Sequence, residues 1–399
     1  MIEVTRKEKC CGCEACVQAC PRRCISFRTD SEGFYYPHAD ANMCVDCGLC
    51  ERVCPMLHKA TTPIDPQPFF FQSTDPVTLS HSSSGGLFFT VASKFIREGG
   101  VVAGATFNRQ WAVEHVCVTT IEDLVQLCSS KYVQSRTGNV FSLVLQLLKE
   151  GKRVFFCGTP CQVKALRQMV NGHQEQLVCA DFICHGVPSP LVWQRWLEHT
   201  AAGRKVSAVN FRSKDTGWNH YHYSLKIYYQ NGDEQSYRIP ESSYLRAYSA
   251  NMILRPSCYR CPMRGKNRWS DFTMADFWGA ESILHPTEET EGVRSLHDHR
   301  QLAIDKGLSL AFANNAKGKE LLQTAGATPL NADIEKLTNS NISYDRQTPT
   351  TALRGAFFSQ MAAQPQHTVA LLEQFTHLSP MMRRYYKIRT FINKLIGTI

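Results

Sequence analysis

The sequence predicts an α+β protein in which a small cysteine-rich domain precedes a larger, mixed α/β body. Ten of the eighteen cysteines fall within residues 1–59, and the Pro-rich segment 60–68 that follows is typical of a linker. Beyond the linker, short apolar runs alternate with amphipathic segments, the order expected of strands interleaved with helices. A chain of 399 residues is also long enough for two or three domains.

The cysteine-rich domain contains the same cysteine spacing twice. Both runs read C-x2-C-x2-C-x3-C-P, and their cysteines are Cys10, Cys13, Cys16, Cys20 and then Cys44, Cys47, Cys50, Cys54. This spacing is typical of a bacterial-type ferredoxin domain with two [4Fe–4S] clusters, in which the fourth cysteine of each run binds the other cluster. We therefore assign Cys54 to the first cluster and Cys20 to the second.

Two zinc ribbons are the alternative interpretation of these cysteines. Zinc ribbons pair one C-x2-C with a second, distant C-x2-C, whereas each run here places four cysteines within eleven residues and ends in proline. Cys11 and Cys24 fall outside the repeated spacing and are interpreted as packed thiols. Since these clusters only transfer electrons, we expect the rest of the chain to contain a second redox centre.

The body is expected to begin with alternating strands and helices. Strands are predicted over 101–107, 153–157 and 177–184, and helices over 140–148, 163–170 and 191–197. Ser189 is the expected N-cap of the last helix, with Pro190 in its first turn. Asn231-Gly232 predicts a hairpin turn. We divide this region into an N-terminal part of the body over 69–150, a C-terminal part over 151–330 and a helical, basic tail over 331–399.

Cysteines of the body suggest a third cluster. Cys161 follows one predicted strand and Cys184 ends the next, so parallel strands would bring both thiols to the edge where open α/β sheets place their ligands. A C-x2-C pair further along completes a hypothetical [4Fe–4S] site of Cys161, Cys184, Cys258 and Cys261. The alternative is that Cys161 and Cys184 are only buried apolar side chains, and Cys157 could replace one of the four.

A Ser- and Gly-rich loop before an amphipathic segment predicts an anion site. Its residues, Ser83, Ser84, Gly85 and Gly86, would offer N–H groups and hydroxyls to a pyrophosphate, although an ordinary capped helix is the alternative. Candidate phosphate contacts include Lys131 and Arg136, whereas most of the other basic residues considered are expected at the surface: Arg212, Lys214, Lys266 and Arg268. The segment 271–279, which contains Asp276, is expected to form either a wall of a flavin or substrate site or a half-buried strand.

These motifs together resemble the coenzyme F420 hydrogenase/dehydrogenase beta-subunit family, in its bacterial branch with an N-terminal two-cluster ferredoxin domain. The resemblance covers roughly residues 1–320 and includes GTPCQ, CHGVPSP and DFWG in that order. It implies a flavin- and cluster-binding body with FAD, a [4Fe–4S] cluster and two-electron exchange with a deazaflavin or comparable acceptor. The cofactor-binding residues are then expected to be Ser83, Ser84, Gly85, Gly86, Lys131, Arg136, Thr159 and Asp276.

The expected function is that of an iron–sulfur flavoprotein oxidoreductase. Electrons would pass between the clusters and a flavin that exchanges a hydride with a deazaflavin-like or other small substrate. His185 is the candidate for proton handling near neutral pH. The alternative is a non-catalytic iron–sulfur subunit of a larger hydrogenase or dehydrogenase. Expected partners are an electron carrier such as ferredoxin or a deazaflavin, and a small molecule that the sequence does not identify.

Charge and hydropathy narrow the remaining possibilities. The net charge of +9, without a recognised nucleic-acid motif, argues against a nucleic-acid partner. The chain has no apolar run of eighteen residues and no signal-peptide pattern, which predicts a cytoplasmic location. The tail is expected either to be a solvated helix or to contact a membrane surface or a partner protein through its basic residues, Arg383, Arg384, Lys387, Arg389 and Lys394.

Overall fold

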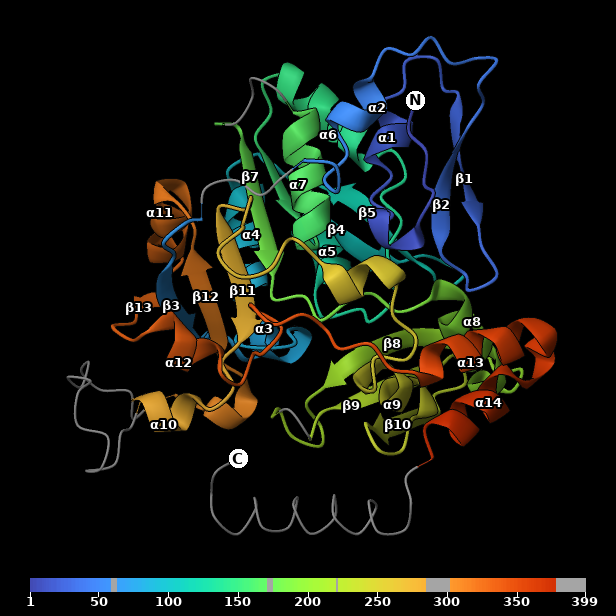
Figure 1. The fold of residues 1–399 in the computed structure, drawn as a ribbon. Coiled ribbons are helices and arrows are strands. Elements are labelled where there is room, and N and C mark those ends of the chain that lie inside the picture. Colours follow the sequence, from blue (N-terminus) through green and yellow to red (C-terminus); the bar gives the residue numbers. More distant parts are fainter. Residues whose placement is uncertain (59–62, 171–174, 220–221, 285–301, 378–399) are drawn as a thin grey trace.

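The computed structural model describes residues 1–58, 63–170, 175–219, 222–284 and 302–377, and its architecture is α+β, as predicted. A small N-terminal module lies against a larger body built on a mixed β-sheet (Figure 1). The module contains η1 (Lys7–Lys9), α1 (Ala15–Gln18), β1 (Ile25–Thr29), β2 (Tyr35–Ala39) and α2 (Leu49–Arg52). Strands β1 and β2 form an antiparallel pair in which Ile25 lies opposite Ala39.

The two cysteine runs of the module share one backbone conformation. In the first run Gly12 and Glu14 have φ values of 70° and 61°, and the equivalent residues of the second run, Asp46 and Gly48, have 49° and 69°. Glu14 and Gly48 directly precede α1 and α2. Because such left-handed residues turn the chain sharply, each run wraps around a common centre before its short helix. The repeat in sequence is therefore also a repeat in structure.

The body is organised around an eight-stranded sheet with the order β13-β3-β12-β11-β7-β6-β4-β5. Its central strands β4, β6, β7 and β11 are parallel, and the outer strands pair antiparallel. The bounds are β3 (Gln67–Phe71), β4 (Val101–Phe107), β5 (Val113–Val118), β6 (Val154–Cys157), β7 (Leu177–Phe182), β11 (Phe272–Asp276), β12 (Ser309–Ala313) and β13 (Thr328–Pro329). The predicted strands over 101–107, 153–157 and 177–184 are confirmed, with the last two slightly shorter than expected.

Helices cover both faces of this sheet, which explains why its central strands are apolar throughout. Adjacent residues of β6 illustrate the two layers. Phe155 packs with Phe95 of α4 (Leu87–Arg97), whereas Phe156 packs with Phe141 of α6 (Val140–Lys149) and Val163 of α7 (Pro160–Met169). The other helices around the sheet are α3 (Pro76–His81), α5 (Ile121–Leu124), η2 (Val125–Leu127), α10 (Ala280–Leu284), η6 (Ile304–Lys306), α11 (Ala316–Thr324) and α12 (Ile334–Thr338).

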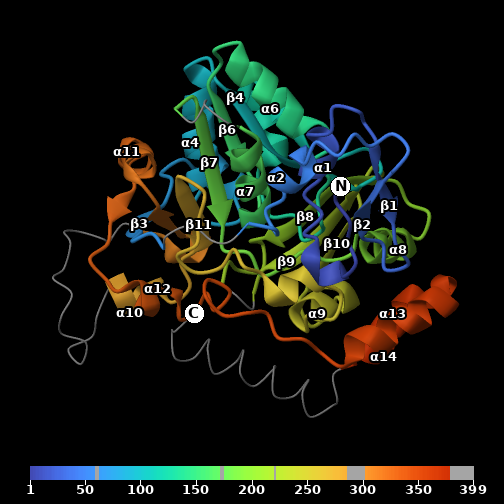
Figure 2. The same cartoon turned by 45° about the horizontal axis from the view of Figure 1, so that its top comes forward.

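A second layer is built on an antiparallel sheet of β8 (Val206–Ser213), β9 (Ser224–Tyr229) and β10 (Glu234–Arg238). The predicted hairpin is confirmed, since Gly232 turns between β9 and β10 with φ 90°. Trp193 and Phe211 lie in the core of this layer. The helices that pack there are α8 (Pro190–Ala201), α9 (Ser243–Ser249), α13 (Leu353–Ala363) and α14 (Thr368–Phe375), with η7 (Pro365–His367) between the last two. Figure 2 shows α13 and α14 together at one edge of the molecule.

Two predicted boundaries need correction. Gln67 and Pro68, assigned to the linker 60–68, are the first residues of β3 and pair with Ala313 and Phe312 of β12, so that segment already belongs to the sheet. The tail 331–399 is helical as far as α14, but its basic residues 383–394 lie outside the described residues. None of the helices in the described ranges is both long and apolar enough to cross a bilayer.

Candidate functional site

The cysteines of the module separate into the two groups that the crossed assignment predicts. In the first group, burial raises the pKa of Cys16, and the neighbouring thiols of Cys10 and Cys54 raise it further. Cys13 belongs to the same group, since Cys16 and Cys54 act on its thiol in the same way. In the second group, four thiols line one small pocket of about 330 Å³, namely Cys20, Cys44, Cys47 and Cys50. Their binding of iron stays a prediction.

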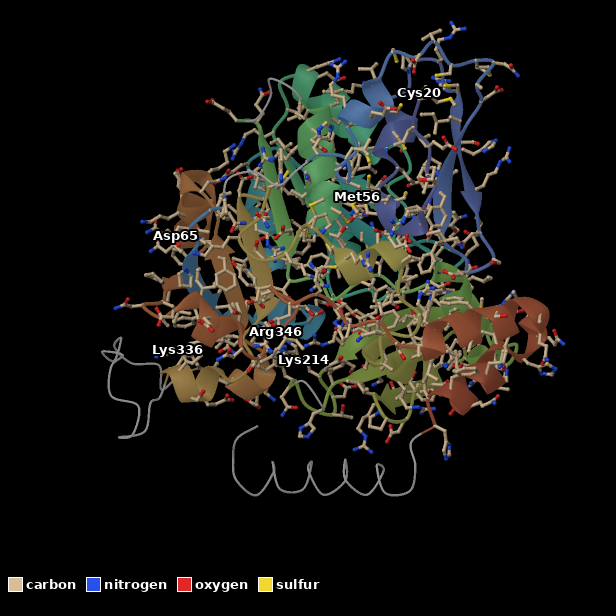
Figure 3. All side chains as sticks on the ribbon, in the orientation of Figure 1. Cys20, Met56, Asp65, Lys214, Lys336 and Arg346 are labelled. Atoms are coloured by element: carbon tan, nitrogen blue, oxygen red, sulfur yellow. The ribbon has the colours of Figure 1, made fainter. Side chains whose placement is uncertain are left out.

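The two groups differ in their access to solvent. Cys47 is exposed, and so are Met43 and Val45 in the same run, so the second group lies at the surface. Cys13 and Cys16 of the first group are buried. Figure 3 shows the same arrangement, with Cys20 near the outer edge of the module and Met56 nearer the middle of the molecule. The first group therefore lies on the side of the module that faces the body.

The four predicted cysteines of the body line a single cavity of about 680 Å³: Cys161, Cys184, Cys258 and Cys261. Cys161 occupies the first turn of α7 after β6, and Cys184 follows β7, so the adjacent parallel strands bring both to one sheet edge. Burial raises the pKa of the Cys184 thiol well above its usual value, and Cys258, Cys161 and Cys261 add to the effect. The predicted juxtaposition of these four thiols is therefore present.

A paired loop brings the distant C-x2-C to this edge. Pro188 forms a bridge with Leu254, and the Arg255 N–H donates to the carbonyl of Val187 at 2.9 Å. Cys258 lies in η3 (Pro256–Arg260), directly after this pairing, and its sulfur accepts a hydrogen bond from the Val187 N–H at 3.4 Å. The pairing fixes Cys258 against the loop that carries Cys184, although 73 residues of sequence separate the two.

The surroundings of the cavity fit an iron–sulfur cluster. Its cysteine ligands are soft thiolates, the donor type that such clusters require. Two guanidinium groups also line it: Arg264 donates to the Ser343 carbonyl at 2.6 Å, and Arg268 lies 3.4 Å from the buried Asp181 carboxylate. Among the described residues no three His, Cys, Asp or Glu converge on a single ion. Thiolates around one zinc would each lie about 2.3 Å from the metal, much closer together than around a four-iron cubane.

Cys11 connects this cavity with the module. Its thiol lines the cavity beside Gly12 and Met56. Hydrogen bonding with Cys13 raises the pKa of the Cys11 thiol, as does burial, against an opposing hydrogen bond with Cys161. Cys11 is therefore packed, as predicted, but between a ligand position of the first module group and one of the body cavity. The two sites are direct neighbours.

Arg136 was expected at a cofactor phosphate, and the structure places it elsewhere. Its Nε donates to the buried carboxylate of Glu14, and its guanidinium lies 4.3 Å from the ring of Tyr35. Glu14 also accepts hydrogen bonds from the N–H groups of Thr137 at 2.6 Å and Gly138 at 2.8 Å. Because a buried carboxylate must be paired, this contact fixes the module on the body, and Arg136 has a docking role.

A large cleft opens at the carboxyl ends of β6, β7 and β11, with a volume of about 5320 Å³ including its open mouth. Seven of the predicted site residues line it: Ser83, Ser84, Gly86, Lys131, Thr159, His185 and Asp276. Helix α4 begins at the cleft, and its N-cap Gly86, with φ 92°, supplies no side chain for the first N–H groups. These N–H groups are therefore available to an anion, as the Ser/Gly loop predicts.

Gly85 is the exception in this loop. It does not line the cleft, and its N–H donates to the Ser309 hydroxyl at 3.0 Å. A side chain at this position would collide with the Phe71 carbonyl oxygen. Gly85 therefore allows the loop to pack closely against β3 and β12, and its expected cofactor contact is wrong.

The basic residues of the cleft are more buried than predicted. Arg212, expected at the surface, is buried beside Asp276 at 2.8 Å, with the rings of Tyr223 and Trp278 on either hand. The Lys131 ammonium donates to three carbonyls, and burial lowers its pKa to about 8. Lys214 does the same, with a pKa of about 8 for the same reason. Carbonyls occupy these ammonium groups, so they act on a ligand through their charge.

The cleft and the cysteine cavity share one wall. Cys184, Gly186 and Thr159 line both spaces. Thr159 is the N-cap of α7, and its hydroxyl lies 3.1 Å from the sulfur of Cys161. His185 lines the cleft next to this wall, where its Nδ1 lies 3.2 Å from the Ser343 hydroxyl and its ring meets the edge of Tyr248. A ligand in the cleft would therefore lie directly beside the cysteine cavity.

Comparisons with known proteins agree with this organisation. Residues 151–332 match the family of the C-terminal region of the coenzyme F420 hydrogenase/dehydrogenase beta subunit, and residues 9–57 match the 4Fe-4S dicluster domain. The F-type subunit of the F(420)H(2) dehydrogenase of Methanosarcina mazei is 24% identical over 190 residues, which are 45% of this chain and 53% of that protein. The chain thus spans about half the length of this curated relative.

Two further similarities concern the module and the fold. A protein named ferredoxin 7Fe, from Hydrogenibacillus schlegelii, is 43% identical over 51 residues, 12% of this chain and 59% of that protein. Among solved structures, one polypeptide of the F420-reducing [NiFe] hydrogenase complex from Methanosarcina barkeri aligns with a TM-score of 0.46 and 15% identity, over 71% of this chain and 90% of that one.

Proposed function

Because residues 9–57 form a 4Fe-4S dicluster domain and residues 151–332 belong to the coenzyme F420 hydrogenase/dehydrogenase beta-subunit family, we propose that this iron–sulfur electron-transfer protein is an FAD-dependent oxidoreductase. The family that the sequence motifs indicate is thereby confirmed. FAD, the third cluster and a deazaflavin-like substrate belong to the proposal.

The order of the sites along the molecule carries this proposal. The second cysteine group lies at the surface, the first group faces the body, the body cavity touches the first group through Cys11, and the cleft shares Cys184 with the cavity. Each site is thus adjacent to the next. An arrangement of this kind suits electron transfer between an external carrier at the module and a ligand in the cleft.

The chain's own residues would bind the cofactors as follows. The cysteines of the body cavity would hold the third cluster, with Arg264 and Arg268 offsetting its negative charge. The start of α4 and the Ser83 hydroxyl would receive the FAD phosphates, within the positive field of Lys131, Arg212 and Lys214. When bound, FAD supplies the exchange between electron pairs and the single electrons that clusters accept. His185, whose Nδ1 Ser343 holds, is positioned to exchange a proton with a ligand.

The size of the cleft supports a second ligand beside the flavin. A typical small-molecule site measures about 300–1,000 Å³, and this cleft exceeds that several-fold even with its open mouth included. Aromatic side chains line much of it, including the stacked pair Trp218 and Trp278, with 4.7 Å between ring centroids. Such surfaces suit a planar ring system, which a deazaflavin would provide.

A non-catalytic electron-transfer subunit remains the second candidate, favoured by the exposed apolar residues Met43 and Val45 around the surface cysteines and by a relative whose name is that of a subunit. Anaerobically purified protein separates the two functions. The enzyme is expected to show a flavin absorbance band that bleaches, together with cluster absorbance, when reduced coenzyme F420 is added. Clusters without any flavin would contradict the enzyme and support the non-catalytic function.

A further inference from the structure

Arg255 is a fully buried guanidinium between the module and the body cavity, and no sequence motif marks it. It precedes Cys258 by three residues, yet its side chain reaches into the module. Its Nε donates to the Cys10 carbonyl at 2.8 Å, and one terminal nitrogen donates to the Cys10 sulfur at 3.5 Å and to the Tyr35 carbonyl at 2.9 Å.

The surrounding chain is shaped to receive this side chain. The guanidinium lies 4.3 Å from the Tyr36 ring centroid and donates to Gln134 Oε1 at 3.0 Å. Gly12, between two cysteines of the first run, has φ 70°, and a Cβ there would collide with Gln134 and come within 2.8 Å of the guanidinium. The glycine is thus required by Arg255 as well as by the turn.

The charge of Arg255 has no carboxylate partner among the described residues, because its hydrogen bonds run to carbonyls, an amide and a thiol. A buried charge without a counter-ion is costly. Burial on its own lowers the pKa of the guanidinium, yet the pKa is raised, because the anionic forms of nearby groups outweigh burial, above all Cys10, with Cys11 and Cys258 among the others. The counter-charge is therefore on the sulfur side.

We propose that Arg255 is a positioning residue that supplies the counter-charge of the cluster held through Cys10 and so raises the reduction potential of that cluster. Reduction adds one electron and no proton or bond, so the cluster becomes more negative by one charge, and the electron comes from the neighbouring body site. A positive group beside a cluster sulfur stabilises the reduced form. This inference rests on the proposed function, because it requires iron–sulfur clusters in the chain.

The test is a redox titration of the full-length, iron-loaded protein, followed by electron paramagnetic resonance. Arg255→Met removes the charge and Arg255→Lys keeps it. Arg204→Met is the matched control, because Arg204 also stacks on a tyrosine ring, Tyr229 at 3.9 Å, and its hydrogen bonds involve no cysteine. We expect one cluster signal to shift to a more negative potential in Arg255→Met, with a much smaller shift in Arg255→Lys and none in the control.

An unchanged potential in Arg255→Met with full iron content would overturn the inference, and so would equal shifts in the methionine and lysine variants. If Arg255→Met does not retain iron, Gln134→Glu answers the same question, because it gives the guanidinium a carboxylate partner. That variant is expected to shift the same signal to a more negative potential, and an unchanged signal would contradict the inference. Absence of clusters from the wild-type protein would instead refute the proposed function.

Discussion

Glu14 shows how a single residue joins the two parts of the molecule. It adopts a left-handed backbone conformation that is uncommon for a residue with a side chain, and its carboxylate is buried. Both costs are offset by the N–H groups of Thr137 and Gly138 and by Arg136. Since the equivalent position of the second run is Gly48, the side chain at position 14 serves the contact with the body.

Glu14→Ala is therefore expected to loosen the module. Two buried N–H groups would lose their acceptor, at about 1 to 3 kcal/mol each. Limited proteolysis near residues 59–62 should become faster than in the wild-type protein. Glu8→Ala is the control, because Glu8 forms only an exposed pair with Arg6 at 3.6 Å. Equal cleavage rates in both variants would show that Glu14 does not hold the module.

His115 makes stability sensitive to acid. It is buried on β5, stacked on Phe156, and burial lowers its pKa to about 4 from an ordinary value of 6.5. The unfolded chain therefore binds a proton that the folded chain refuses between these values, so stability falls as the pH drops from about 6.5 to 4. The loss amounts to about 3 kcal/mol at most.

The prediction for His115→Phe follows from this titration. Phenylalanine can stack on Phe156 without titrating, so the melting temperature of the variant should fall less than that of the wild-type protein between pH 7.5 and pH 5. Parallel declines of the two proteins over this range would show that other groups dominate acid sensitivity.

At the scale of secondary structure, α4 presents its first turn to the cleft. Gly86→Ala places a Cβ 2.8 Å from Thr78 Cγ2 at φ 92° and should disturb the proposed phosphate site, so FAD content per chain is expected to decrease several-fold. Gly99→Ala is the matched control: it follows the same helix at φ 79°, and no atom lies within 4 Å of its added Cβ. Equal FAD content in the two variants would remove α4 from the flavin site.

The sequence predicts well what depends on local spacing. The strand and helix order of the body, the hairpin at Gly232 and the N-cap Ser189 follow from neighbouring residues, and the structure contains them. Contacts between distant segments are different. Arg136 resembles any basic residue near a glycine, and only the folded chain shows that it meets Glu14, 122 residues away. Arg255 and Cys10 are separated by 245 residues, so no local signal marks their contact.

The third cysteine site lies between these cases. Two of its members were found from their position after predicted parallel strands, a rule that reaches beyond local spacing. The structure brings Cys161 and Cys184 to one sheet edge and adds Cys258 and Cys261 through the loop pairing at Pro188 and Leu254. The strand rule cannot predict Cys11 at this cavity, because the position of Cys11 depends on how the module docks.

For the molecule as a whole, function depends on the sequence of adjacent sites from the exposed module cysteines to the cleft. The body cavity is the middle of this sequence, since it touches the first module group on one side and shares a wall with the cleft on the other. Without a cluster there, the module and the cleft would have no redox centre between them.

Iron content tests this central claim most directly. Anaerobically purified wild-type protein is predicted to hold about twelve iron atoms per chain, and the double variant Cys184→Ser, Cys258→Ser about eight, because the module keeps its two clusters. Cys117→Ser, which changes a cysteine packed against the apolar core, should keep about twelve. About eight iron atoms in the wild-type protein, or an undiminished content in the double variant, would contradict the account.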